Sequence, residues 1–218
     1  MDGNGRWAAA RRVPVADGHR EGARALRRTV EAAIDLEVTS LAVYAFSTEN
    51  WARPADEVES ILELMDETIE RELPDLAKQG VRTRFFGRRD RVPAALQGKM
   101  ATLERETSAN DRLHLWIAFD YGGRAEVVEA ARRLVEEGIE PGDVDDEAIA
   151  ARLYAPELPD PDLVIRTSGE QRLSNFLLWQ SAYAELVFTE TLWPDFGEDD
   201  LRAALDEYAR RARRFGAR

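Results

Sequence analysis

Residues 113–124 have the sequence LHLWIAFDYGGR, in which a mostly apolar run ends at an aspartate, a tyrosine and two glycines. A short apolar run bounded by turn residues predicts a buried strand over 113–119. Apolar residues then recur at helical spacing, which predicts a helix over 124–137. A buried strand that leads into a helix is typical of α/β proteins.

The same alternation continues on both sides of this segment. Helices are predicted over residues 20–36, 55–79, 93–108, 146–154 and 199–214, and strands over 40–46, 81–86, 162–165 and 186–189. Pro74 falls inside one predicted helix, and we expect it to bend or interrupt that helix. The pattern predicts an α/β fold: a single domain over residues 1–218, with a mostly parallel central sheet flanked by helices.

The composition excludes several classes of protein. The 218 residues include no cysteine, which rules out a disulfide scaffold, a cysteine-ligated zinc or iron–sulfur site and a thiol nucleophile. A net charge of −12 argues against binding nucleic acid through the overall field of the protein. No apolar leader is visible, and the apolar runs are far shorter than the roughly 20 residues of a membrane span, so we expect a cytoplasmic protein.

Polar clusters directly follow three of the predicted strands, where ligands bind in a parallel sheet. They are residues 47–53 (STENWAR), 120–124 (DYGGR) and 166–174 (RTSGEQRLS). In the last cluster two arginines flank a small, hydroxyl-rich stretch, which suits a loop that wraps around a diphosphate. The alternatives are a loop with a helix N-cap for residues 47–53 and a solvated turn for residues 166–174.

A fourth cluster, Asp2-Gly3-Asn4-Gly5-Arg6-Trp7, lies at the start of the sequence. Its glycines let the backbone approach a ligand, its carboxylate suits Mg²⁺, and its arginine suits phosphate oxygens. The alternative is a frayed turn. The cluster also matches the dinucleotide fingerprint G-x-G-x-x-A, but no strand precedes it, so we do not expect nicotinamide or flavin binding.

Other phosphate-binding and catalytic motifs are missing from the sequence. Gly98-Lys99 is followed by methionine, so there is no Walker loop, and no G-x-S-x-G motif occurs. The two histidines, His19 and His114, are too few for a multi-histidine metal site, and His19 is by default structural or capping. The clusters therefore predict chemistry on phosphate or diphosphate esters with Mg²⁺, and they leave the reaction open.

The motifs at these positions resemble those of the cis-prenyltransferases, the undecaprenyl diphosphate synthase family. Nearly the whole chain is covered, in the family's order, by MDGNGRWA, GHREGA, YAFSTENWARP, YGGR, DLVIRTSGEQRLSNFLLWQSAYAEL and LWPDF. The resemblance implies the fold of this family and an enzyme that condenses isopentenyl diphosphate with an allylic diphosphate, such as farnesyl or geranyl diphosphate, in Z configuration. It also implies Mg²⁺ as cofactor, a homodimer, and peripheral contact with a membrane for product release.

The resemblance further implies roles for individual residues. Asp2 matches the essential aspartate that binds Mg²⁺ and diphosphate, Asn50 matches the proposed proton acceptor, and Glu185 matches a second metal-linked carboxylate near the dimer interface. The residues that match the allylic diphosphate site are Gly3, Asn4, Gly5, Arg6, Trp7 and His19. Those that match the mobile substrate loop are Ser47, Thr48, Glu49, Trp51 and Arg53, and those that match the isopentenyl diphosphate site are Arg166, Arg172, Leu173 and Ser174.

The chain departs from the family pattern in two places. Val15 stands four residues before His19, where the family usually has an arginine that helps to grip the allylic diphosphate, and Arg11 or Arg12 are candidates to replace it. The family also runs a hydrophobic strand directly into the Asp-Gly-Asn segment. Because this chain begins at Met1, we expect that first strand to be missing and its neighbours to lack a partner.

The product and the activity leave alternatives. Ala45 is small where short-chain members tend to carry a bulkier residue, and residues 57–80 contain no long-chain insertion, which favours a medium-chain product for a cell-wall lipid carrier. One alternative is a catalytically silent or impaired partner subunit, although Asp2 and Asn50 are present. The others are a short-chain or branched monoterpenoid diphosphate synthase and a hydrolase of simple phosphate esters.

Overall fold

The computed structural model of the protein describes residues 1–211 and, for residues 72–74 and 77, the backbone only. The described chain divides into two compact units whose segments alternate along the sequence. The first unit comprises Met1–Glu37, Pro161–Arg172 and the segment from Tyr183 onward. The second unit comprises Val38–Asp160 and Leu173–Ala182.

The second unit is built on a parallel sheet of three strands in the order β1-β3-β2. The strands are β1 (Ser40–Ser47), β2 (Val81–Phe86) and β3 (Leu113–Tyr121). The central strand β3 pairs on both sides, so Ile117 lies opposite Val43 of β1 and Phe85 of β2. All residues of β3 except His114 are buried, as expected for a strand that is covered on both faces.

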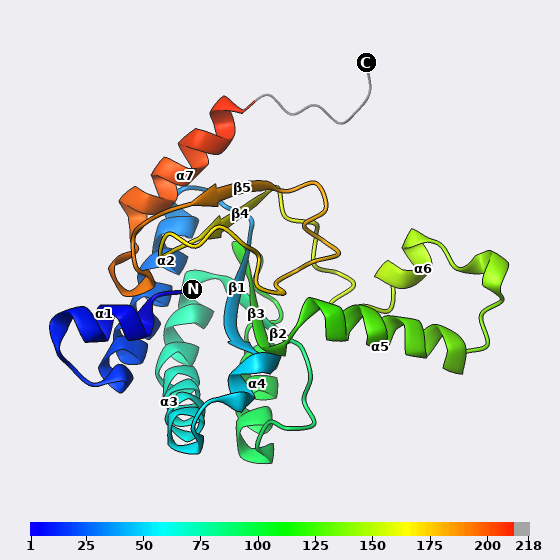
Figure 1. Ribbon diagram of the computed structural model, residues 1–218, viewed down its shortest axis with the longest axis horizontal. Coiled ribbons are helices and arrows are strands. Elements are labelled where there is room, and N and C mark those ends of the chain that lie inside the picture. The colour runs from blue at the N-terminus through cyan, green and yellow to red at the C-terminus, as the bar shows by residue number, and fades with distance from the viewer. Residues whose placement is uncertain (212–218) are drawn as a thin grey trace. The chain divides into compact units, whose positions relative to one another are not determined.

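The helical segments of the second unit connect these strands. They are η1 (Thr48–Ala52), α3 (Ala55–Gln79), α4 (Ala94–Glu106), α5 (Gly123–Glu136), η2 (Pro141–Asp143) and α6 (Asp146–Ala150). The helices α3 and α4 pack against each other and against β2, while α5 leads away from the end of β3 and packs against α6 (Figure 1). Contrary to the expectation of an interruption, α3 continues through Pro74. The turns on both sides and the packing of α3 on α4 and β2 offset the one backbone hydrogen bond that proline removes.

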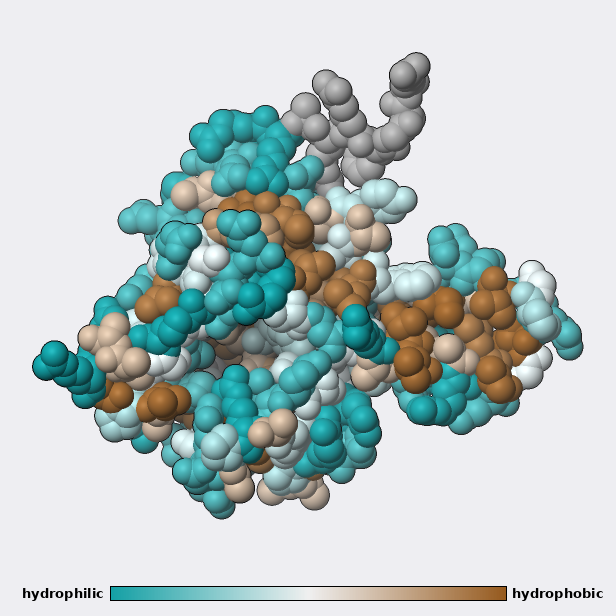
Figure 2. All heavy atoms as spheres, in the orientation of Figure 1, coloured by the Kyte–Doolittle hydropathy of each residue, from teal (hydrophilic) through white to brown (hydrophobic). Residues whose placement is uncertain are grey.

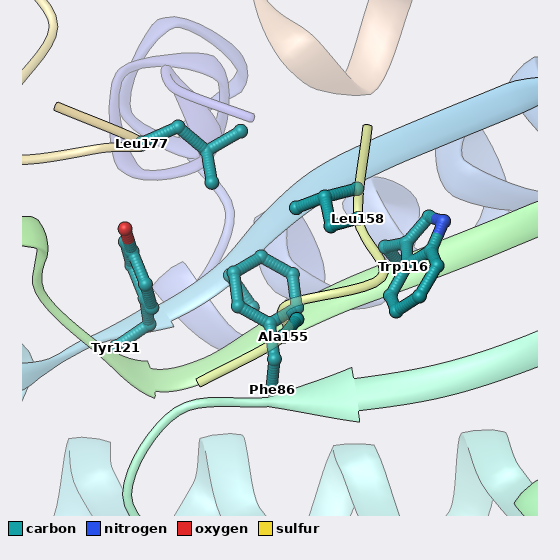
Figure 3. Packing of buried hydrophobic residues seen from close by; sticks show 7 residues of the cluster. Phe86, Trp116, Tyr121, Ala155, Leu158 and Leu177 are labelled. Carbon is teal, nitrogen blue, oxygen red and sulfur yellow. The ribbon is translucent and has the colours of Figure 1, made fainter. Parts of the chain in front are cut away.

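An aromatic core fixes the carboxyl ends of β2 and β3 (Figure 3). The buried cluster consists of Phe86, Trp116, Ala118, Tyr121, Ala155, Leu158 and Leu177. The ring of Tyr121 meets that of Phe86 edge to face at a centroid distance of 5.0 Å, and its hydroxyl donates to Glu126 Oε2 at 2.5 Å. Leu177 packs in the same cluster, so the segment 173–182 is anchored beside the end of the sheet.

The first unit contains the remaining elements. They are α1 (Asn4–Arg11), α2 (Val15–Asp35), β4 (Leu163–Arg166), β5 (Glu185–Phe188), η3 (Trp193–Asp195) and α7 (Glu198–Arg210). The strands β4 and β5 form a parallel pair in which Leu163 lies opposite Glu185 and Arg166 opposite Phe188. Small and apolar residues of α2, including Ala25, Val30 and Ala33, are buried, and this helix packs against α1, η3 and α7.

The predicted α/β class is confirmed, with parallel strands and covering helices in each unit. The strands form two sheets where one was predicted. Helix α1 was not predicted, and α2 begins five residues earlier than expected, directly after Pro14. The last residues of the predicted helix 199–214 lie outside the described residues. Within residues 1–211, no helix combines the length and the apolar character that a membrane crossing requires.

Candidate active site

Residues 4–7 of the N-terminal cluster form the first turn of helix α1, which the sequence did not predict. Gly3 precedes the helix with φ 110°, and a Cβ at this position would lie 2.9 Å from Leu192 Cδ2, so the position requires glycine. The first helical hydrogen bond runs from the Trp7 N–H to the Gly3 carbonyl at 2.8 Å. The three N–H groups before it have no acceptor within the helix, and with the helix dipole they favour an anion at this end.

The Asp2 carboxylate lies between two guanidinium groups at the start of this helix. Arg166 Nη2 lies 2.9 Å from Asp2 Oδ2, and Arg6 Nη2 lies 3.5 Å from Asp2 Oδ1. The backbone of Asp2 is held by Thr167, whose hydroxyl accepts from the Asp2 N–H at 2.9 Å and donates to the Asp2 carbonyl at 2.8 Å. These bonds fix the aspartate at the carboxyl end of β4.

Asp2 is ionised at neutral pH. Partial burial raises its pKa, but the hydrogen bond and charge of Arg166, followed by the charge of Arg6, hold the pKa below its usual value of 3.8. One carboxylate together with substrate phosphate oxygens is a common ligand set for Mg²⁺. Asp2 therefore fits a Mg²⁺ ion that is shared with a bound diphosphate.

The loop after β4 gathers further arginine contacts. Arg6 donates to the Ser168 carbonyl at 2.9 Å and to Ser168 Oγ at 2.5 Å. Arg166 donates to the carbonyl of Arg172, and the Arg172 guanidinium pairs with Glu170. Three guanidinium groups thus lie around one loop, an arrangement that suits bidentate binding of phosphate oxygens.

Trp7 is held against η3 of the same unit. Its indole N–H donates to Asp195 Oδ1 at 2.7 Å, and the Arg11 guanidinium lies 4.2 Å from the centroid of its ring. Arg11 also pairs with Asp195 at 3.1 Å. Arg11, one candidate for the missing family arginine, is therefore engaged with Asp195 in this structure.

His19 lies on α2 beside the start of α1. It follows Gly18, where an added Cβ would come within 2.3 Å of the Asn4 carbonyl oxygen, so the two helices meet closely at this point. Val15 is the first residue of α2 and is 46% exposed. An arginine-sized side chain therefore has solvent-accessible space at position 15.

In the second unit, the predicted substrate loop begins where β1 ends. Ser47 is the last residue of β1, and Thr48 is the first of η1. The side chain of Asn50 folds back over this turn, and its Oδ1 accepts from the Ser47 N–H at 2.9 Å. This hydrogen bond fixes the Asn50 side chain at the carboxyl end of β1. The side-chain oxygen of Asn50 retains a second lone pair.

Glu49 is joined to Asn175, a residue that the sequence did not single out. Asn175 Nδ2 donates to Glu49 Oε1 at 2.8 Å, and Asn175 Oδ1 accepts from the Arg124 N–H at 2.8 Å. The Thr48 hydroxyl donates to the other Glu49 oxygen at 3.1 Å. Burial raises the pKa of Glu49, but these hydrogen bonds, that of Asn175 foremost, hold the pKa below its usual value of 4.5.

The remaining loop residues of the second unit have separate partners. Arg53 pairs with Glu57 at 2.8 Å and is not part of the Glu49–Asn175 group. The Trp51 indole N–H donates to the buried Asp120 Oδ1 at 2.9 Å. Leu173 and Ser174 open the segment 173–182, and Ser174 has a positive φ of 48°.

Within one chain, Glu185 is not placed beside Asp2. It begins β5 opposite Leu163, whereas Arg166, the partner of Asp2, ends β4. Three strand positions correspond to about 10 Å along the ladder. Glu185 instead accepts from Arg211 Nη1 at 2.9 Å. Among the side chains described over residues 1–211, no group of three or more histidine, aspartate or glutamate residues could hold a metal ion.

The predicted site residues thus form two groups, one in each unit. Asp2, Arg6, Arg166 and Arg172 come together in the first unit, and Ser47, Glu49 and Asn50 in the second. Asn175 directly follows the predicted Ser174, and its φ of 67° is a conformation that asparagine tolerates. An asparagine next to Ser174 is a turn signal that the sequence contains. The hydrogen bond of Asn175 to Glu49 spans 126 positions, and no sequence pattern indicates it.

Comparison with known proteins gives concordant matches over the whole chain. Residues 1–216 match the family model of the undecaprenyl diphosphate synthases. A ditrans,polycis-undecaprenyl-diphosphate synthase, (2E,6E)-farnesyl-diphosphate specific, from Xanthomonas axonopodis pv. citri is 50% identical, over 99% of this chain and 86% of the relative. An isoprenyl transferase from Fusobacterium nucleatum is 49% identical, over 99% of this chain and 93% of the relative.

Solved structures agree with these matches. Lavandulyl diphosphate synthase from Lavandula x intermedia, in complex with dimethylallyl diphosphate, superposes with a TM-score of 0.95 at 37% identity, covering 100% of this chain and 95% of that chain. A probable undecaprenyl diphosphate synthase from Campylobacter jejuni gives a TM-score of 0.82 at 35% identity, covering 90% of this chain and 92% of that chain.

An α/β fold with several arginines at the start of a helix is typical of proteins that bind phosphate-bearing ligands. The matches specify that class further: the chain belongs to the undecaprenyl diphosphate synthase family, the cis-prenyltransferases, which are transferases of prenyl groups. The family resemblance seen in the sequence is therefore confirmed.

Proposed function

We propose that this protein is a Mg²⁺-dependent cis-prenyltransferase that condenses isopentenyl diphosphate with an allylic diphosphate in Z configuration. Farnesyl diphosphate is the expected primer, because the Xanthomonas relative is named as specific for it. The expected product is a medium-chain polyprenyl diphosphate that serves as a cell-wall lipid carrier. The observation that carries the proposal is the ionised Asp2 carboxylate between Arg6 and Arg166 at the start of α1.

The first chemical step is the loss of diphosphate from the allylic substrate. The allylic C–O bond breaks, and the diphosphate leaves with the bonding electron pair. We expect the N–H groups that open α1, together with Arg6, to stabilise this negative charge. Asp2 would hold Mg²⁺, which supplies Lewis-acid neutralisation of the leaving group when it is bound.

The second step forms the new carbon–carbon bond. The double bond of isopentenyl diphosphate attacks the allylic cation, and a proton is then lost to leave the new double bond. On the family resemblance, we assign the diphosphate of this substrate to Arg166 and Arg172 of the first unit. Asn50 is assigned the proton, and its side-chain oxygen, bonded once to the Ser47 N–H, retains a lone pair for this role.

We also propose that the protein works as a homodimer. Val128 and Val135 on α5 are 58% and 80% exposed, and Figure 2 shows apolar side chains gathered over the α5–α6 region. Tyr183, in the first unit, is 80% exposed. Large exposed apolar side chains that gather in this way are typical of contact surfaces. A second copy is also the expected source of a Glu185 carboxylate for the site.

The test is an incubation of the purified protein with farnesyl diphosphate, labelled isopentenyl diphosphate, Mg²⁺ and detergent. We expect label in an organic-extractable polyprenyl product, and we expect loss of transfer with EDTA or with Asp2→Ala. Asp17→Ala is the matched control, since Asp17 is a surface aspartate of the same unit that pairs with Arg20 at 2.7 Å. No transfer from a folded protein, with geranyl diphosphate also inactive, would contradict the proposal and favour a silent or impaired subunit.

A branched, short-chain product is the second candidate, and the TM-score of 0.95 to lavandulyl diphosphate synthase favours it. Incubation with dimethylallyl diphosphate alone separates the two. A ten-carbon diphosphate formed without isopentenyl diphosphate would support this candidate, whereas an absolute requirement for isopentenyl diphosphate and a ladder of longer products would support chain elongation.

A further inference from the structure

The carboxyl ends of the three strands of the second unit converge on one buried carboxylate. Asp120 is the penultimate residue of the central strand β3 and is 0% exposed. Its φ of 49° lies in the left-handed region, which turns the chain at this point. Trp51 approaches it from the segment after β1, and Arg91 approaches it from the segment after β2.

The three side chains form one hydrogen-bonded group. The Trp51 indole N–H donates to Asp120 Oδ1 at 2.9 Å. Arg91 Nε donates to Asp120 Oδ2 at 3.2 Å, and Arg91 Nη2 donates to Asp120 Oδ1, so the guanidinium binds in a bidentate manner. The Arg91 guanidinium also lies 5.1 Å from the centroid of the Trp51 ring, within the range of a cation–π contact.

Trp51 is in turn the anchor of a short segment. It follows Asn50 directly, and its ring meets that of Phe46 edge to face at 5.2 Å. Asn50 and Trp51 both lie in the helix η1, which has only five residues, Thr48–Ala52. So short a helix cannot hold its own position through backbone hydrogen bonds, and its side-chain contacts must do so.

A role in stability alone does not require a buried ion pair between Asp120 and Arg91. A buried ion pair is weak support for stability, because desolvation opposes the attraction, and apolar residues of similar volume often do as well. An acid and an arginine that both contact one tryptophan instead fix a direction, since hydrogen bonds to the indole N–H and to the guanidinium fork are geometrically specific.

We propose that Asp120 and Arg91 are positioning residues for prenyl transfer, which hold Trp51 and thereby set the place of Asn50. This inference rests on the proposed function, in which Asn50 accepts the proton. Neither residue needs to touch a substrate. Because their effect on the reaction passes through Trp51, replacing Asp120 should have no effect once Trp51 can no longer donate a hydrogen bond to it.

The experiment is a double-mutant cycle of Asp120→Ala and Trp51→Phe. Phenylalanine keeps a ring beside Phe46 but has no N–H to donate to Asp120. Misplacement of a reacting group by about 1 Å costs on the order of a hundredfold, so we expect Asp120→Ala to lower kcat by about ten- to a hundredfold. The KM for the allylic diphosphate should not change, because its proposed ligands lie in the first unit. In the Trp51→Phe background the same substitution should have little further effect.

The matched control is Asp90→Ala. Asp90 lies next to Arg91, and its carboxylate pairs with the Arg88 guanidinium at 2.8 Å on the exposed surface. We expect its kcat to match that of the wild type. If Asp120→Ala does not fold, Asp120→Asn replaces it, since asparagine keeps the shape and an acceptor for Trp51 but loses the charge that binds Arg91.

A fluorescence measurement separates failure of this inference from failure of the proposed function. The emission of Trp51, taken as the difference between matched proteins with and without Trp51→Phe, should shift to the red and become more accessible to acrylamide when Asp120 is replaced. Absence of transfer by the wild type would contradict only the proposed function. Unchanged Trp51 emission, or an undiminished loss of kcat in the Trp51→Phe background, would overturn the positioning role.

Discussion

Val15 lies where the family resemblance leads us to expect an arginine that grips the allylic diphosphate, and its exposure of 46% allows a test by substitution. We expect Val15→Arg to lower the KM for the allylic diphosphate by about ten- to a hundredfold, since a charge-assisted hydrogen bond contributes about 1.5–3 kcal/mol. Steady-state kinetics at saturating isopentenyl diphosphate measure the effect. Val13→Arg is the control, because Val13 is also exposed and an arginine there adds the same charge two positions away.

If both variants lower the KM equally, the gain is a general field effect and position 15 has no specific contact with the diphosphate. If neither does, the site gains nothing from an arginine at the start of α2.

The ion pair of Asp2 also predicts a pH dependence of stability. The pKa of Asp2 is lower in the folded protein than its usual value of 3.8, so the stabilisation is present above that usual value and is lost as the pH falls through the folded-state pKa. We expect the free energy of unfolding of the wild type to exceed that of Asp2→Asn by a constant amount above about pH 5 and by a shrinking amount below pH 4. Urea denaturation across this range measures both proteins, and a difference that grows towards acid pH would contradict the assignment.

Single residues differ in how far the sequence predicts them. The residue types and motif positions of Asp2, Arg6 and Arg166 are enough to indicate an anion site, and the structure brings these three side chains together. Asp120 was noted only as part of a polar cluster. Its partners Trp51 and Arg91 lie 69 and 29 positions away, and no local pattern links them.

At the scale of elements, the contact between α1 and α2 depends on the absence of a side chain at Gly18. An added Cβ would lie 2.3 Å from the Asn4 carbonyl oxygen, so Gly18→Ala must displace the start of α1. We expect a lower melting temperature and a raised KM for the allylic diphosphate, although alanine is favoured over glycine in a helix by about 1 kcal/mol. Thermal denaturation and steady-state kinetics measure the two effects.

Gly98→Ala is the matched control for this prediction. Gly98 lies within α4, and nothing lies within 4 Å of an added Cβ there, so alanine should stabilise the protein slightly. A rise in melting temperature for Gly18→Ala that equals the rise for Gly98→Ala would mean that α1 and α2 do not meet as described.

The same contact explains why α1 was missed. Its sequence NGRWAAAR begins with asparagine and glycine, which are poor helix formers, and its position depends on packing against a helix that begins eleven residues later. The strands β1, β2 and β3 are easier to predict, because each is a short apolar run between turn residues. Their predicted limits agree with the observed ones to within two residues. Periodicity predicts elements well where burial produces the pattern and poorly where a tertiary contact selects the element.

At the scale of the whole molecule, the place of Glu185 predicts an exchange between subunits. If each Glu185 serves the partner's site, Asp2→Ala and Glu185→Ala are both inactive as homodimers. A mixed dimer then has one site with both wild-type residues and one site with neither. After equal amounts are mixed and allowed to exchange, we expect about a quarter of the wild-type activity.

Mixing before and after denaturation and refolding controls for slow exchange. If the mixture stays inactive while size-exclusion chromatography shows mixed dimers, Glu185 acts within its own chain, or not at all. Glu185 pairs with Arg211 at 2.9 Å in the single chain, so Arg211→Ala tests separately whether freeing this carboxylate changes the activity.

The arginine loop after β4 has a consequence for how the enzyme should respond to salt. The side chains around this loop include three guanidinium groups, on Arg6, Arg166 and Arg172, and two carboxylates, on Asp2 and Glu170, so their net charge is a single positive charge. A diphosphate ester brings about three negative charges at neutral pH. With one diphosphate and one divalent cation bound, these groups have no net charge. Substrate and cation would therefore arrive as a weakly charged pair with little long-range attraction, and the KM should vary little with ionic strength although the substrate is an anion.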